Sequence, residues 1–134
     1  MIWALDTNVV VVSLRRNTPP RIVERFRLAR PDSIVVPEMV RAELLHGCLK
    51  SHRPKENRKA VERFLAPFRH LPFDSVAAEH YAEIRTYLER RGELIGPNDL
   101  VIAATARAAG ATLVTRNTTQ FQRVPGLLCE NWEK

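Results

Sequence analysis

Short apolar runs alternate with longer amphipathic segments along this chain. The runs at residues 2–5, 33–36 and 112–115 are typical of buried strands in a parallel sheet, and residues 127–129 are a weaker candidate. The hydrophobic spacing and the positions of proline predict helices from about residue 9, from residue 19, from residue 37, and over residues 54–68, 76–88 and 98–109. Strands that alternate with helices favour an α/β domain, with a mostly parallel sheet of four or five strands flanked by helices. The length of 134 residues fits one domain over residues 1–134.

Polar residues stand where several of these strands end. Asp6 follows the first strand, Asp99 opens the alanine-rich helix, and Asn117 follows the strand at residues 112–115. Ligands of open parallel sheets bind outside the carboxyl ends of the strands, so we expect these three residues near such a site. A simpler interpretation is that Asp6 caps the helix after it and that Asn98 or Asp99 caps the alanine-rich helix.

Glu43 is placed unusually for an acid, because its helical spacing puts it beside the apolar face of its own helix. A carboxylate in that position must form an ion pair, become neutral or bind a cation, since an unpaired buried charge is costly. Arg41 and Arg116 are the candidate ion-pair partners. If Glu43 instead joins Asp6 and Asp99, the three acids repel one another unless a divalent cation neutralises them. Oxygen ligands of this kind suit Mg²⁺ or Mn²⁺.

Basic residues are concentrated in the first half of the chain. The net charge is +6, and 17 of the 21 basic residues are arginine, whose planar guanidinium pairs well with phosphate. The densest stretch predicts RNA contacts by four residues: Arg53, Lys55, Arg58 and Lys59. Of the whole chain, residues 53–58 at the start of the predicted helix are the best candidate for a mobile loop. A nucleic acid or an acidic protein is the indicated partner, and a solvated helix face is the alternative. With the acidic cation site, this charge favours metal-dependent hydrolysis of nucleic-acid phosphodiesters.

Other features narrow the class of protein. The longest uncharged apolar run, residues 9–14, is far too short to cross a bilayer. The first residues lack the pattern of a secretory signal, and the two cysteines have no spacing typical of a metal or redox site, so we expect a cytoplasmic protein.

Four sequence motifs, in order along the chain, resemble the PIN-domain ribonucleases and, within them, the VapC-type toxins of bacterial toxin–antitoxin pairs. They are Asp6-Thr7-Asn8, Ala42-Glu43-Leu44, residues 98–104 and residues 114–118. Each motif alone is weak, but the resemblance runs from Ile2 to Trp132 and the intervals between motifs are similar to those of the family.

The resemblance implies a PIN-like, Rossmann-like sheet and a Mg²⁺ or Mn²⁺ site in which Asp6, Glu43 and Asp99 are the catalytic and metal-binding residues. It implies endonucleolytic cleavage of RNA that leaves a 3′-hydroxyl and a 5′-phosphate and inhibits translation, with transfer RNA as one candidate substrate. Asn8, Thr115 and Asn117 would orient the carboxylates. Many PIN domains carry a fourth acid where this chain has Asn117, which bears on whether a second metal binds.

The resemblance also implies partners. A nuclease that cuts the RNA of its own cell must be held inactive, so we expect a VapB-like antitoxin that inserts a basic side chain among the three acids. We further expect a homodimer that pairs through four apolar residues of the early helices: Leu14, Ile22, Phe26 and Leu28.

Two other functions compete with this one. A metal-free ribonuclease would need a pair of histidines, but His46, His52, His70 and His80 all fall in predicted helices or beside them, away from the expected edge. A non-catalytic module that binds RNA or protein would keep the fold without the chemistry, yet three clustered acids would only repel RNA. Loss of RNA cleavage on addition of EDTA separates the metal enzyme from both.

Overall fold

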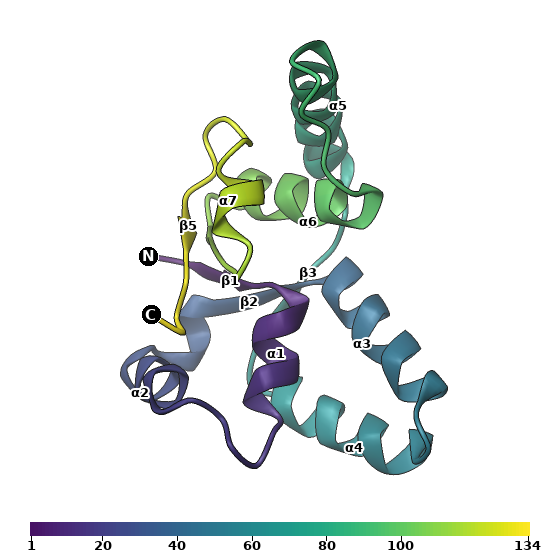
Figure 1. Ribbon diagram of the computed structural model, residues 1–134, viewed down its shortest axis with the longest axis vertical. Coiled ribbons are helices and arrows are strands. Elements are labelled where there is room, and N and C mark those ends of the chain that lie inside the picture. The colour runs from purple at the N-terminus through teal and green to yellow at the C-terminus, as the bar shows by residue number, and fades with distance from the viewer.

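Five strands form one parallel sheet in the computed structural model, which describes residues 1–134 (Figure 1). The strands are β1 (Trp3–Leu5), β2 (Ile34–Pro37), β3 (Arg69–Leu71), β4 (Thr112–Val114) and β5 (Cys129–Glu130), in the order β3-β2-β1-β4-β5. The helices are α1 (Thr7–Ser13), α2 (Pro20–Leu28), α3 (Glu38–Lys50), α4 (Pro54–Leu65), α5 (Ser75–Arg90), α6 (Pro97–Ala108) and α7 (Thr118–Phe121), with a short 3₁₀ turn at Pro31–Ser33. The predicted α/β fold is confirmed.

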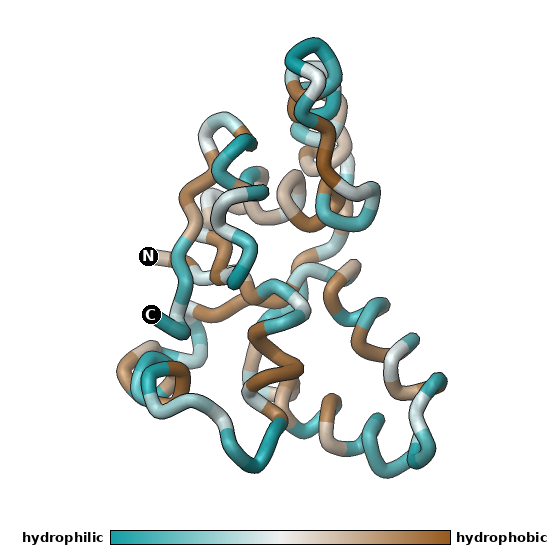
Figure 2. The backbone as a smooth tube through the Cα atoms, viewed as in Figure 1, coloured by the Kyte–Doolittle hydropathy of each residue, from teal (hydrophilic) through white to brown (hydrophobic).

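The sheet is covered on both faces. In Figure 1, α5, α6 and α7 lie on one side of it and α1, α2, α3 and α4 lie on the other. Residues 34–37 of β2 are all buried, and the apolar colour in Figure 2 follows the strands and the inner sides of the helices. Val40, Leu44 and Cys48 of α3 are buried as their spacing predicts. No helix is long and apolar enough to span a membrane.

Strand register brings the carboxyl ends of β1, β4 and β5 together. Leu5 lies opposite Val114, and Val114 lies opposite Glu130. One residue farther on, the Asp6 N–H donates to the Val114 carbonyl oxygen at 3.0 Å, and the Thr115 N–H donates to the Glu130 carbonyl oxygen at 2.9 Å. Asp6 and Thr115 therefore start from neighbouring points of one sheet edge.

Several local predictions are wrong. The helix expected over residues 54–68 ends at Leu65, and β3 follows it as an edge strand. Its side chains are only partly buried, so Arg69-His70-Leu71 carries no apolar run for sequence analysis to detect. Residues 53–58 do not form a loop, because α4 begins at Pro54, a favourable first helical residue.

The apolar residues predicted to form a dimer face also need correction. Ile22 is fully buried within the subunit. Phe26 packs edge-to-face against Phe64 and Trp132, with ring centroids 5.6 and 5.1 Å apart. Of the four residues, only Leu14 and Leu28 are exposed, and Ile22 and Phe26 pack in or against the core of the subunit.

Candidate active site

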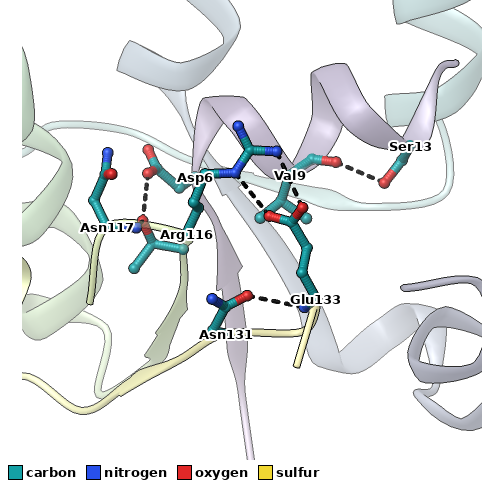
Figure 3. Close-up of polar contacts among 8 residues, drawn as sticks. Asp6, Val9, Ser13, Arg116, Asn117, Asn131 and Glu133 are labelled. Carbon is teal, nitrogen blue, oxygen red and sulfur yellow. Dashed lines mark hydrogen bonds and ion pairs between the residues drawn. The ribbon is translucent and has the colours of Figure 1, made fainter. Parts of the chain in front are cut away.

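Asp6 is a buried carboxylate at the carboxyl end of β1, with 4 % of its surface exposed. It is the N-cap of α1, and its Oδ1 accepts the Thr7 N–H at 2.9 Å. Its Oδ2 accepts the Thr115 hydroxyl at 2.7 Å (Figure 3). Burial raises the pKa of Asp6, the bonds from Thr115 and Thr7 oppose that rise, and the charges of Asp99 and Glu43 add to it. Capping therefore explains part of the placement of Asp6, but not its charged neighbours.

Asp99 lies in the first turn of α6 and is partly buried. It is not the N-cap of α6, because Gly96 takes that position. Its Oδ2 instead accepts a hydrogen bond from Gln120 Nε2 on α7 at 2.7 Å. Burial raises the pKa of Asp99, the Gln120 bond opposes the rise, and the charge of Glu43 adds to it. The surroundings of Asp99 thus disfavour its ionised form in the absence of a cation.

Glu43 reaches toward the same edge from α3. Its Oε1 accepts the Thr7 hydroxyl at 2.6 Å, and its Oε2 accepts Asn98 Nδ2 at 3.3 Å. The expected ion-pair partners are both occupied elsewhere. Arg41 pairs with Glu62 at 2.9 Å, and Arg116 pairs with Glu133 at 2.9 Å. Thr7 therefore links two of the acids, since its backbone N–H donates a hydrogen bond to Asp6 and its hydroxyl donates one to Glu43.

The three carboxylates share one electrostatic feature: none of them forms an ion pair. Their hydrogen-bond donors are neutral hydroxyl, amide and backbone groups. No three His, Cys, Asp or Glu side chains converge closely enough to hold a metal by themselves. Magnesium needs only one or two protein carboxylates, since it keeps several of its waters, so the oxygen-only donor set fits such an ion.

The side chains expected to orient the carboxylates differ in what they touch. Thr115 bonds Asp6, and the Asn117 backbone N–H donates to the Thr115 hydroxyl oxygen at 3.0 Å. The Asn117 side chain is exposed. Asn8 is exposed and makes no hydrogen bond to any of the three acids. Sequence analysis missed the roles of three donors, which are Thr7, Asn98 and Gln120.

Each missed donor carried a faint signal. Thr7 and Asn98 adjoin Asp6 and Asp99 in the sequence, and Gln120 follows Asn117 by three residues, about one helical turn. Nothing in the sequence tells which acid each one reaches.

A groove of about 510 Å³ extends from Glu43, one of the three acids, to α4, the helix that carries the basic residues predicted to bind RNA. Its lining comes from α1, α3 and α4 and includes Thr7 and Glu43 at the acidic end and Asn57 and Ala60 on α4. The four basic residues predicted to bind RNA are all exposed at the start of α4. Arg53 and Arg58 lie 3.2 and 3.9 Å from Glu56 and Glu62, while Lys55 and Lys59 form no ion pair.

Comparison with known proteins gives the family. The chain matches the PIN domain over residues 4–127. It belongs to the PIN domain family. It is 38 % identical to Ribonuclease VapC2 of Rickettsia felis over 134 residues, which is all of both chains. It is also 38 % identical to the tRNA(fMet)-specific endonuclease VapC of Shigella flexneri over 130 residues, which is 97 % of each chain.

Solved structures agree with this assignment of the PIN domain. VapBC2 from Rickettsia felis bound to a DNA fragment of its promoter matches with a TM-score of 0.91 and 38 % identity, covering 98 % of this chain and 99 % of that one. DNA-bound VapBC from Salmonella typhimurium matches with a TM-score of 0.92 and 36 % identity, covering 98 % of each chain. The resemblance seen in the four motifs is thereby confirmed.

None of the four histidines of this PIN domain forms a hydrogen bond or ion pair with the three acids. His70 Nδ1 is 3.1 Å from Glu38, and His80 Nδ1 accepts a hydrogen bond from Arg107 Nε at 2.8 Å. His46 and His52 are exposed and form no hydrogen bond or ion pair with Asp6, Glu43 or Asp99. The structure therefore offers no histidine pair for acid–base cleavage at this edge.

Proposed function

We propose that this PIN domain is a Mg²⁺- or Mn²⁺-dependent endoribonuclease and the toxin of a toxin–antitoxin pair. The observation that carries the proposal is the set of three neighbouring carboxylates, Asp6, Glu43 and Asp99, which no basic side chain neutralises. One or two of these carboxylates would hold the cation directly and the others through its bound waters, since the three do not converge closely enough to bind it alone. A site that raises the pKa of Asp6 and Asp99 favours an added positive charge.

The chemistry follows from the donor set. A divalent cation bound there lowers the pKa of a water and offsets negative charge on the phosphate. Thr115 and Gln120 hold Asp6 and Asp99 in place through bonds of 2.7 Å each, so that these carboxylates keep their direction when RNA arrives. Hydrolysis of the phosphodiester would leave a 3′-hydroxyl and a 5′-phosphate, and the resulting damage to RNA would inhibit translation.

We propose transfer RNA as the substrate class, because a relative that is 38 % identical is named a tRNA(fMet)-specific endonuclease. Asn57 and Ala60 of α4 line the groove that contains Glu43, and the exposed basic residues next to them in the sequence would bind the RNA backbone. Cleavage of purified transfer RNA and ribosomal RNA under identical conditions tests this choice. Equal cleavage of both would contradict it.

We propose an antitoxin as the protein partner, because the similar solved structures are VapBC complexes. The uncompensated acids favour a basic side chain as the inhibiting group, since a guanidinium can pair with a carboxylate through two hydrogen bonds. We also propose a homodimer, for which α1 and α2 and the residue that follows α1 offer four exposed apolar side chains: Val11, Leu14, Val23 and Leu28.

The deciding experiment measures cleavage of labelled transfer RNA by the purified chain with Mg²⁺ or Mn²⁺, with and without EDTA. The variant Asp99→Asn should lower the rate at least about 100-fold, because it removes a proposed ligand. Asp74→Asn is the matched control, since it removes a carboxylate at the N-cap of α5 while asparagine still caps well. Cleavage that persists in EDTA, or an Asp99→Asn rate equal to that of Asp74→Asn, would refute the proposal.

A further inference from the structure

Arg116 and Glu133 form a two-point ion pair beside the acidic edge. Arg116 Nε donates to Glu133 Oε2 at 2.9 Å, and a terminal guanidinium nitrogen donates to Oε1 at 3.0 Å (Figure 3). A guanidinium grips two oxygens of a phosphate in this same parallel geometry. The Glu133 carboxylate thus fills the position on Arg116 that a phosphate would take.

The backbone holds Arg116 close to the proposed cation site. Arg116 follows Thr115, whose hydroxyl bonds Asp6, and it lies two residues after Val114, whose carbonyl oxygen accepts the Asp6 N–H. Its side chain is 45 % exposed, so solvent and ligands can reach it. An arginine in this place can contact RNA whose cleaved phosphate lies at the three acids.

Glu133 is held against Arg116 by its own neighbours. Trp132 is buried with 1 % of its surface exposed and anchors the segment, and the Glu133 N–H donates to Asn131 Oδ1 at 2.9 Å. The hydrogen bonds from Arg116 lower the pKa of Glu133, and the charges of Arg116 and Arg15 lower it as well. Glu133 is therefore an ionised carboxylate whose direct partner is the Arg116 guanidinium.

We propose that Arg116 binds a backbone phosphate of the RNA and that Glu133 is an internal anion which the phosphate displaces. This inference rests on the proposed function, because it takes RNA as the substrate. Three uncompensated acids repel RNA, so a positively charged side chain beside them is needed to bind the RNA backbone. The pair is partly exposed and therefore weak enough for a phosphate to open.

Glu133 would then set the affinity for RNA by competition. Without RNA it keeps Arg116 paired and pointed along the edge. With RNA, the guanidinium exchanges one anion for another, and Glu133 turns to solvent. Glu133 and the phosphate should therefore oppose each other in binding, whereas a purely structural Glu133 would support Arg116 and strengthen binding.

The test measures the dissociation constant of a fluorescent single-stranded RNA by anisotropy in one Mg²⁺ buffer. Every protein carries Asp99→Asn, so that the RNA stays intact. Glu133→Gln should bind RNA about fivefold more tightly, the change expected from loss of one exposed competing ion pair. Arg116→Ala should bind about fivefold more weakly and lower the slope of affinity against salt by about 0.7. Combined with Arg116→Ala, Glu133→Gln should have no further effect.

Glu89→Gln is the matched control, because it removes the same charge from an exposed pair with Arg85 on α5. The inference is overturned if Glu133→Gln binds no more tightly than this control, or if it tightens binding equally in the absence of Arg116. Circular dichroism and the urea midpoint verify that each variant is folded. If the wild-type chain cleaves no RNA while the binding pattern holds, the proposed function fails and this inference stands. If the chain cleaves RNA and the pattern is absent, the inference alone fails.

Discussion

The substitution Thr115→Val removes one hydroxyl from the buried edge of the sheet and nearly preserves the shape of the side chain. Thr115 is fully buried, and its hydroxyl donates to Asp6 Oδ2 at 2.7 Å while accepting the Asn117 N–H at 3.0 Å. Loss of a hydrogen bond to a charged group costs about 1.5–3 kcal/mol. Asn117 is exposed, so water can replace the partner of its N–H and adds little to the cost.

We therefore expect Thr115→Val to lower the free energy of unfolding by about 2 kcal/mol at pH 7, and Tm by about 6–10 °C. The sign of the pH dependence follows from Asp6. Burial already raises its pKa, and deletion of the Thr115 bond raises the folded-state pKa further. A carboxyl with a raised folded-state pKa costs stability once it ionises, so the penalty is full above that pKa and shrinks as pH falls toward 3.8.

Urea unfolding of the metal-free chain at pH 7 and pH 4 measures both effects. Thr115→Ser is the control, because it keeps the hydroxyl and loses only a methyl group, at a cost of about 1 kcal/mol. The reasoning is refuted if Thr115→Val is as stable as Thr115→Ser at pH 7, or if its penalty is the same at both values of pH. Calorimetry should also show that Thr115→Val binds Mn²⁺ about 10- to 100-fold more weakly, because Thr115 orients a proposed metal ligand.

Four further predictions follow from the site and the surface around it. Asp99→Asn should raise the stability of the metal-free chain by about 0.5 kcal/mol at pH 7, because burial and Glu43 raise the pKa of Asp99. The gain should vanish as the pH falls toward 3.8, and a net loss of stability in urea unfolding would contradict the prediction. Four basic residues at the start of α4 are to be replaced by alanine: Arg53, Lys55, Arg58 and Lys59. The replacements should weaken binding to every RNA sequence and lower the slope of affinity against salt by about 0.7 per contact, whereas an unchanged slope would show that these residues are only a solvated surface. An antitoxin peptide with a basic plug should bind less tightly as Mn²⁺ rises at constant ionic strength, and a constant affinity would place the inhibitor elsewhere. Light scattering at micromolar concentration should give the mass of a dimer, and a monomer would contradict the proposed assembly.

Local chemistry explains why much of the fold was predictable from sequence. The runs that became β1, β2 and β4 are uncharged and mostly apolar because these strands are largely buried on both faces, and prolines mark the first turns of α2, α4 and α6. The placement of Asp6 and Asp99 at one edge follows from strand direction and helix start alone. Such features depend on a few neighbouring residues, so they can be predicted from the sequence without the tertiary structure.

Partners across the chain were decided by the tertiary structure. Glu43 bonds Thr7 and Asn98 rather than an arginine, because the arginines suggested by spacing lie nearer to other acids. The chain has 17 arginines, and the sequence alone does not show that Arg116 is the one that lies beside Glu133. Burial is equally non-local, as Ile22 shows: an apolar residue on a helix can face the core or a second subunit, and only the packing of the other helices settles which.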